Sequence, residues 1–275
     1  MTSASAAAVE PVPGAAKHDP VLVVDGVQRS FGGVRAVDVE HLEVERGSIT
    51  ALIGPNGAGK TTLFNLLTGF DRAERGTWQF EGRPLAGLPA HRIAQLGMVR
   101  TFQLTKVLPG MTVLDNMLLA ARDQPGERFL PALVARLWRP REAEVVERAR
   151  DLLTKVGLSA KAEDLAGTLS GGQRKLLELA RALMVEPALV MLDEPMAGVN
   201  PALTESLLQH ITAIRDEGRS VVFVEHDMDV VHEISDWVVV MAQGRILAEG
   251  TPDHVVADQR VIDAYLGKAA RSDRG

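Results

Sequence analysis

One segment constrains this chain more than any other feature. It reads Gly54-Pro55-Asn56-Gly57-Ala58-Gly59-Lys60-Thr61 and matches the pattern G-x-x-x-x-G-K-[ST] of phosphate-binding loops. The apolar residues 48–53 before it follow a glycine, which is typical of a short buried strand. Residues 61–67 after it have the spacing of a helix with one apolar face. A strand, a glycine loop and a helix in this order predict a site for ATP or GTP.

The chemistry of this loop follows from its residue types. Glycines let the backbone curl so that its N–H groups point at phosphate oxygens, and the helix N-terminus adds partial positive charge. Lys60 would reach the β- and γ-phosphates, and the Thr61 hydroxyl would bind Mg²⁺. We include Thr62, the next residue, among the nucleotide-binding positions. The alternative is a glycine-rich turn before an ordinary helix, which the flanking strand and helix disfavour.

A second motif lies in the other half of the chain. Leu169-Ser170-Gly171-Gly172-Gln173 precedes a run of strong helix formers at residues 174–183. Ser170 is a natural N-cap, and Gly171 and Gly172 expose the backbone N–H groups of the first turn. Such an N-terminus, with Gln173 beside it, predicts a second anion site. The alternative, a capped helix with a flexible entry, is disfavoured by the phosphate loop in the same chain.

With both motifs present, the chain resembles the nucleotide-binding subunits of ABC transporters, whose signature motif reads LSGGQ. The resemblance covers residues 21–267 and implies one ABC ATPase domain. Its fold class is α/β: a P-loop NTPase (ABC ATPase) core with a mixed sheet, a small antiparallel β subdomain and an α-helical subdomain at about 104–168. Residues 1–20 are expected to be a disordered tail and residues 268–275 a flexible one.

Residues 188–193 match the Walker B pattern of this family, an apolar strand that ends in a carboxylate. A buried strand would deliver Asp193 to the carboxyl edge of the sheet, where it can hold Mg²⁺ through a water molecule. Glu194 follows and would act as general base toward the attacking water. In the alternative, Asp193 and Glu194 merely cap the strand before Pro195.

Two further catalytic residues come from the resemblance alone. His226, which follows the apolar residues 219–225, is the counterpart of the switch histidine that contacts the γ-phosphate and orients the base and the water. Gln103 resembles the Q-loop glutamine, which touches Mg²⁺ and the water and senses the membrane partner. Together with Lys60 and Glu194, these two residues make four expected catalytic positions: Lys60, Gln103, Glu194 and His226.

Phe31, in a turn with two glycines, is the candidate for the ring that stacks on adenine. An aromatic residue here could equally belong to the core, and Val34 or Val37 could share the packing. Asn200 departs from the family pattern, because an aspartate usually follows the catalytic glutamate in this loop. An amide can still hydrogen-bond across a dimer interface but supplies no charge.

Composition narrows the class of protein. The 275 residues carry a net charge of −6, which argues against nucleic acid as the main partner. The absence of cysteine excludes disulfides, thiolate zinc sites and cysteine nucleophiles. No apolar run approaches the roughly 18 residues that cross a bilayer. The first twenty residues lack the pattern of a signal peptide, so the chain is expected to be soluble on its own.

The resemblance also implies partners. The phosphate loop covers one face of ATP, and in the family the signature helix of a second ATP-binding subunit covers the other, so that two chains sandwich two ATP molecules. Membrane permease subunits are expected to dock between Gln103 and Gly110, and an extracytoplasmic substrate-binding protein is expected in the complex. The chain is then expected at the cytoplasmic face of the membrane, as a peripheral subunit.

Several segments together look like the ATP-binding subunits of branched-chain amino-acid importers; they are residues 99–103, 111–116, 156–158, 224–228 and 264–267. Urea and short-chain amide importers share these features, and the lipopolysaccharide-export ATPase shares some. None of these residues touches the cargo, so the assignment rests on analogy. The chain could instead be an ABC ATPase that acts on nucleic acid. Such proteins usually have two cassettes, a long coiled coil or zinc-binding cysteines, and this sequence shows none of these. A subunit that binds ATP without hydrolysing it is disfavoured by Glu194 and His226.

Overall fold

The computed structural model describes residues 9–101, 107–121 and 135–272, and the side chains of 135–141 and 266–272 are outside that description. The described strands form two sheets. The smaller one has the order β2-β1-β4-β5 and is antiparallel; its strands are β1 (Pro20–Phe31), β2 (Val34–Glu45), β4 (Arg75–Phe80) and β5 (Arg83–Pro84).

The larger sheet has the order β10-β9-β3-β8-β7-β6, parallel except for the β9–β10 hairpin. Its strands are β3 (Ile49–Ile53), β6 (Met98–Arg100), β7 (Leu189–Asp193), β8 (Ser220–Val224), β9 (Trp237–Ala242) and β10 (Arg245–Gly250). The sequence signals located these strands because runs of apolar and β-branched residues bounded by turn residues are typical of buried strands.

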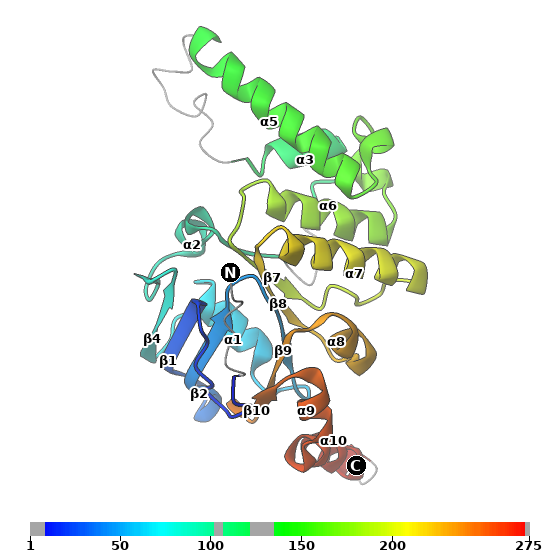
Figure 1. Cartoon of the computed structure of the whole chain (residues 1–275). Helices are drawn as coiled ribbons and strands as arrows, with labels where there is room; N and C mark the ends of the chain where they lie inside the picture. Colours follow the sequence, from blue (N-terminus) through cyan, green and yellow to red (C-terminus); the bar gives the residue numbers. More distant parts are fainter. Residues whose placement is uncertain (1–8, 102–106, 122–134, 273–275) are drawn as a thin grey trace, which may run out of the picture.

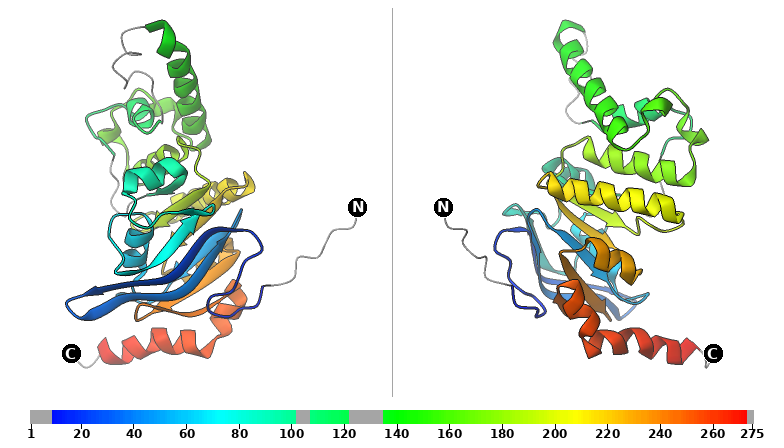
Figure 2. Two further views of the ribbon diagram at one scale, coloured as in Figure 1. Left: turned by 90° about the vertical axis from the view of Figure 1, so that its left-hand side faces the viewer. Right: turned by 45° about the vertical axis from the view of Figure 1, so that its right-hand side comes forward.

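The α-helices complete the α/β fold. They are α1 (Lys60–Leu67), α2 (Ala90–Leu96), α3 (Val113–Leu118), α5 (Ala135–Lys155), α6 (Gly171–Leu183), α7 (Pro201–Asp216), α8 (Met228–Ile234), α9 (Pro252–Ala257) and α10 (Gln259–Ser272). Figure 1 shows α3, α5 and α6 together at the top of the molecule, with the strands and α1 below. Figure 2 shows α9 and α10, in red, at the opposite end. Among these helices none is long and apolar enough to cross a membrane.

Alternation along the central strands builds two cores. In β8, Val221 and Phe223 face a core shared with the helices α3 and α5–α9, whereas Val222 and Val224 face a second core. That second core lies between the two sheets and contains the apolar face of α1, including Phe64. Helix α1 is therefore fixed from both sides, and with it the loop that precedes it.

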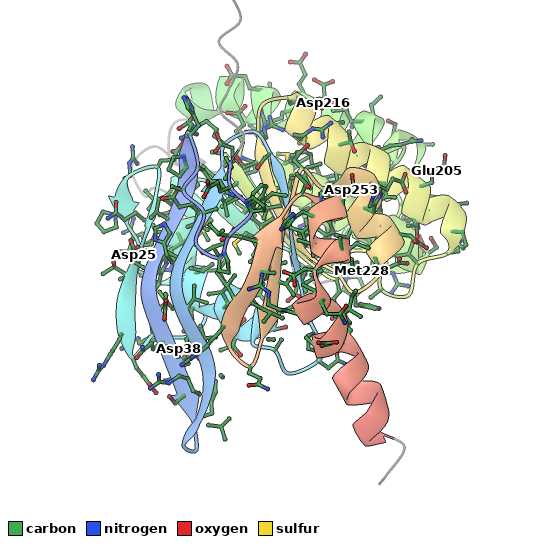
Figure 3. All side chains as sticks on the ribbon, turned by 60° about the horizontal axis from the view of Figure 1, so that its bottom comes forward. Asp25, Asp38, Glu205, Asp216, Met228 and Asp253 are labelled. Carbon is green, nitrogen blue, oxygen red and sulfur yellow. The ribbon has the colours of Figure 1, made fainter. Side chains whose placement is uncertain are left out.

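A polar contact joins the edges of the two sheets. Asp38 of β2 (Figure 3) accepts hydrogen bonds from Arg245 of β10 at 3.0 and 2.8 Å and from Arg35 at 3.2 Å. These donors lower the pKa of Asp38, although burial acts in the opposite direction and is the largest influence. The Asp38 N–H also donates to the Gly244 carbonyl at 2.7 Å. The β9–β10 hairpin is thus tied to the small sheet.

The α/β class with a mixed sheet, a small antiparallel sheet and a helical part is confirmed. Residues 9–20 and 268–272 of the expected tails are among the described residues. Ala15 is buried, and Lys17 lies 4.0 Å from Glu249 and 3.4 Å from the centre of the Trp237 ring. Helix α10 continues to Ser272. Lys17 thus contacts β9 and β10, while the two tails and the exact domain limits stay predictions.

Candidate functional site

The candidate site forms where adjacent parallel strands end. Val224 of β8 pairs with Leu52 of β3 on one side and with Asp193 of β7 on the other, so the three strands end at one level. The phosphate loop follows β3, and Glu194 follows β7. His226 comes two residues after β8, and β6 ends at Arg100 on the far side of β7. The carboxyl edge of the sheet therefore brings the predicted groups together, as expected for an α/β fold.

The phosphate loop is held by close backbone contacts. Gly54 has φ 144° and Gly59 has φ 104°, conformations that residues with a side chain rarely adopt. A Cβ atom at Gly54 would lie 2.1 Å from the Met241 carbonyl oxygen, and one at Gly59 would lie 2.3 Å from the Ala36 carbonyl oxygen. These two glycines are required by the packing around the loop as well as by its curvature.

The lysine of the loop is the first residue of α1. The Lys60 ammonium donates to the carbonyls of Gly54 at 2.6 Å and Pro55 at 3.3 Å, so it lies over the loop. Thr61 beside it is exposed. The N-cap of α1 is Gly59, which has no side chain. The first backbone N–H groups of α1 are therefore not capped by a side chain at this position. This arrangement suits an oxygen-rich anion.

The Walker B carboxylate is buried and paired with an arginine. Arg100 of β6 donates to Asp193 at 2.7 Å, and their side chains are 5% and 3% exposed. Arg100 also donates to Asn65 of α1 at 2.6 Å. A buried charge needs a partner with good hydrogen bonds, and here β6, β7 and α1 supply one network. No linear pattern predicts this role of Arg100, because its partner Asp193 lies far along the chain.

The residues present fit a magnesium ion. Asp193 engages Arg100 through Oδ2, which leaves its other carboxylate oxygen, and Thr61 offers a hydroxyl. Mg²⁺ prefers such hard oxygen ligands and usually keeps several waters. The third predicted ligand, Gln103, lies outside the described residues.

The candidate base begins the next loop. Glu194 is half-buried and has φ 48°, in the left-handed region that is uncommon for residues other than glycine. Its N–H donates to the Val224 carbonyl at 3.1 Å. His226 is exposed, and its Nδ1 lies 3.7 Å from the buried carboxylate of Glu225. The structure thus places the base and the histidine on neighbouring strand ends.

Glu225, which sequence analysis did not single out, is 1% exposed in its side chain. Its carboxylate accepts from the N–H of Met196 at 2.9 Å and from that of His226 at 3.3 Å. Burial raises the pKa of Glu225, while these hydrogen bonds act in the opposite direction. Glu225 therefore links the loop after Glu194 to the residue that follows β8.

The signature segment is a capped helix start, as predicted. The Ser170 hydroxyl accepts from the Gln173 N–H at 3.2 Å, and the Gln173 side chain accepts from the Ser170 N–H at 3.0 Å. This reciprocal pair is a capping box. Figure 1 shows α6 in the helical part and α1 among the strands. The two predicted anion sites of one chain thus belong to different parts of it.

The two signature glycines have different surroundings. A Cβ atom at Gly171 would meet nothing within 4 Å, whereas one at Gly172 would lie 1.5 Å from Cδ2 of Leu203 in α7. A Cβ atom at Gly172 would therefore force the Leu203 side chain to move, whereas Gly171 keeps an open face. Asn200 accepts the Leu203 N–H at 3.0 Å and is the N-cap of α7. The residue that departs from the family pattern thus has a local role.

Phe31 does not belong to the core. Its side chain is 49% exposed at the end of β1, and the Arg29 guanidinium lies 4.6 Å from its ring centre. Val34 is 71% exposed, whereas Val37 is fully buried in the core between the sheets. The core alternative is therefore wrong for Phe31, and the buried Val37 has no exposed surface with which to share the packing on adenine. Stacking of Phe31 on adenine stays a prediction.

Comparison with known proteins agrees with this geometry. The family model described as ABC transporter matches residues 37–197, and one described as branched-chain amino acid ATP-binding cassette transporter matches residues 245–271. A relative from Pseudomonas aeruginosa, the high-affinity branched-chain amino acid transport ATP-binding protein BraF, is 44% identical over 91% of this chain and 99% of its own. The probable branched-chain amino acid transport ATP-binding protein LivG of Archaeoglobus fulgidus is 42% identical over 90% and 95%.

Solved structures give the same result. A nucleotide-free ATP-binding cassette from an ABC transporter superposes with a TM-score of 0.77 at 37% identity, covering 90% of this chain and 98% of the other. The ADP conformation of an ATP-binding cassette of an ABC transporter gives a TM-score of 0.78 at 38% identity, with 90% and 99% covered.

The first prediction concerns the Arg100–Asp193 pair. Replacing Arg100 by Met should lower the free energy of unfolding by about 3–5 kcal/mol, because it leaves the Asp193 carboxylate buried without its counter-ion. Urea unfolding followed by circular dichroism measures this loss. Arg83→Met on the exposed strand β5 is the control and should stay within about 0.5 kcal/mol of wild type. Equal losses in the two variants would contradict the assigned role.

The second prediction uses the signature glycines as a matched pair. Gly172→Ala should be less stable than Gly171→Ala by about 1–3 kcal/mol, since only the former forces Leu203 to move. Both positions lie in the first turn of α6, so the helix propensity of alanine acts on both. Thermal unfolding of the two variants gives the difference. Equal midpoints would mean that α7 does not constrain the signature turn.

Proposed function

Because the chain belongs to the ABC transporter family and is one of its ATP-hydrolysing subunits, we propose that it powers the import of branched-chain amino acids. The assignment of branched-chain amino acids as the cargo rests on the C-terminal family match at residues 245–271. Relatives that match this chain over nearly their full length support it. These residues form β10, α9 and α10. Tyr265 of α10 packs against the core that contains Ile53, the last residue of β3 before the phosphate loop. This C-terminal element therefore shares a core with the strand that leads into the loop.

The proposed mechanism assigns each described group one task. Lys60 binds the β- and γ-phosphates, and the N–H groups of the loop surround them. Mg²⁺, held by Asp193 and Thr61, would neutralise phosphate charge when bound. Glu194 accepts the proton of the attacking water, and His226 orients the water and the γ-phosphate. Such a reaction depends on positioning and charge, which the edge of the sheet supplies.

We infer that two ATP-binding subunits act together. Ser170 and Gly171 are exposed at the start of α6, and Figure 1 shows α6 in the helical part, above the strands and α1. The exposed helix start would cover ATP held by a second subunit, and the second subunit would do the same in return. ATP then joins the two subunits, and loss of the γ-phosphate separates them.

The same proposal places the chain at the cytoplasmic face of the membrane, in contact with permease subunits and served by an extracytoplasmic substrate-binding protein. Support comes from the described part of the expected docking stretch. Leu108 is 44% exposed, and its backbone N–H and carbonyl are both held by the buried Asn116, at 2.9 and 3.0 Å. Leu119 and Leu165, 56% and 51% exposed, lie on the same helical part. Exposed leucines near a residue whose backbone is held in place suit a protein partner.

The third prediction tests the catalytic base. Glu194→Gln should retain ATP binding but lose about 10²–10⁴-fold in turnover, since an amide cannot accept the proton of the water. ATP and Mg²⁺ should then convert the variant from monomer to dimer, as measured by light scattering during size exclusion. Lys60→Ala should prevent this dimer by weakening nucleotide binding. Hydrolysis by Glu194→Gln at the wild-type rate would remove Glu194 from the proposed role.

The fourth prediction tests the cargo. Deleting the gene from its host should abolish high-affinity uptake of radiolabelled leucine, isoleucine and valine and leave urea uptake intact. The wild-type gene should restore uptake, and the Glu194→Gln gene should not. Loss of urea uptake with normal uptake of branched-chain amino acids would instead assign the chain to a urea importer.

A further inference from the structure

The loop that joins β7 to α7 starts with a residue in an unfavourable conformation. Glu194 has φ 48°, a region that Asn and Asp adopt more readily than the longer side chain of glutamate. A residue keeps such a conformation only when its surroundings over-determine it, and such residues gather at functional sites. The contacts that hold Glu194 are therefore of interest for its function.

One lysine of α6 holds this loop from one side. The Lys175 ammonium donates to the carbonyl oxygens of Glu194 at 3.3 Å, Pro195 at 2.8 Å and Ala197 at 2.6 Å. An ammonium has three N–H donors, so this set of carbonyls uses all of them. The converging carbonyls bind the ammonium much as they would bind a free cation.

The other side of the loop is held by the end of β8. The Glu194 N–H donates to the Val224 carbonyl at 3.1 Å, and the Met196 N–H donates to the buried carboxylate of Glu225 at 2.9 Å. The loop therefore has carbonyls on a cation of α6, and N–H groups on the last residue of β8 and on Glu225, which follows it. This clamp fixes the direction of each peptide in the strained segment.

Side-chain packing does not replace the clamp. A cavity of about 30 Å³ lies between α6, β7 and α7, and Lys175, Glu194 and Pro195 are among the residues that line it. Loosely filled space behind a loop allows it to relax when a polar contact is removed. The hydrogen bonds to Lys175 thus add to the contacts of Met196 and Val199 with the core in setting the position of Glu194.

We propose that Lys175 is a positioning residue for ATP hydrolysis, which sets the backbone of Glu194 and couples it to the signature helix. This inference rests on the proposed role of Glu194 as base. Burial lowers the pKa of Lys175, and the neighbouring carboxylates of Glu225, Glu178 and Glu194 oppose that shift. Burial therefore makes the ammonium less favourable here than in water, and the acidic groups of the same site offset part of that cost.

The proposal has a consequence for two-site coupling. Lys175 and Ser170 belong to the same stretch of α6, and Ser170 faces the nucleotide of the other subunit in the proposed sandwich. A shift of α6 on that nucleotide moves the ammonium, and the ammonium carries the Glu194 carbonyl with it. Each chain then links the ATP that it covers to the ATP that it hydrolyses.

The fifth prediction is made for the full chain in steady-state hydrolysis. Lys175→Met, which keeps the length of the side chain and removes the ammonium, should lower kcat about tenfold or more while KM for ATP stays within about twofold, because a misplaced base slows chemistry without weakening binding. The matched control is Lys155→Met on α5, where the lysine pairs with Glu217 at the surface. This control should keep both parameters.

A charge-restoring experiment separates positioning from folding. The chain contains no cysteine, so Lys175→Cys provides a single thiol. Alkylation with 2-bromoethylamine creates a lysine-like ammonium, and alkylation with 1-bromopropane creates an uncharged side chain of similar size. The first product should recover most of the wild-type kcat, and the second should remain as slow as Lys175→Met. Hydrogen exchange at residues 194–199 should be faster in the uncharged product.

The outcomes distinguish this inference from its premise. Wild-type kcat in Lys175→Met, or equal rates in the two alkylated products, would overturn the positioning role even if Glu194→Gln is inactive. A parallel rise in KM would assign Lys175 to nucleotide binding and overturn it as well. Normal hydrolysis by Glu194→Gln would remove the base, and with it both the proposed mechanism and this inference.

Discussion

The structure depends on one close approach of backbone to backbone at the phosphate loop. Gly54 and Gly59 lie so near the carbonyls of Met241 and Ala36 that a Cβ atom would come within 2.1 and 2.3 Å of them. Gly244 completes the junction, because its N–H donates to the loop at 2.9 Å. The loop thereby joins the small sheet to the β9–β10 hairpin of the large one. A phosphate-binding backbone can be rigid before its ligand arrives only if such neighbours hold it.

Charge is the second constraint on this edge of the sheet. Parallel strands bring their carboxyl ends together. Asp193, Glu194 and Glu225 therefore lie close to one another in a region that is largely shielded from solvent. Each buried carboxylate needs donors, and neighbouring elements supply them: Arg100 binds Asp193, and backbone N–H groups bind Glu225. The polar network of the site therefore also ties β6 and β7 to α1, and the loop after β7 to the residue that follows β8. The same hydrogen bonds thus contribute to the geometry of the site and to stability.

The sequence predicted the parts of this site that are local. The phosphate loop and the signature helix carry their own turn and cap residues, so a short pattern determines each. Pairings between distant residues leave no such pattern, which is why Arg100 and Lys175 were not singled out. The buried contact of Lys17 with Glu249 was missed for the same reason. Gly172 was predicted to expose backbone N–H groups, but its contact with Leu203 became visible only when α7 was placed on α6.

Asn200 shows how the loop after the base can work without the usual aspartate. The oxygen of its side-chain amide accepts the Leu203 N–H and caps α7, so the far end of the loop is fixed by a neutral group. The near end is fixed by two charged groups of the same chain, Lys175 and Glu225. The shape of the loop is therefore set within one chain and needs no charge from a partner. A second subunit would meet a preformed surface, and a displacement of α6 would reach Glu194 through the ammonium of Lys175.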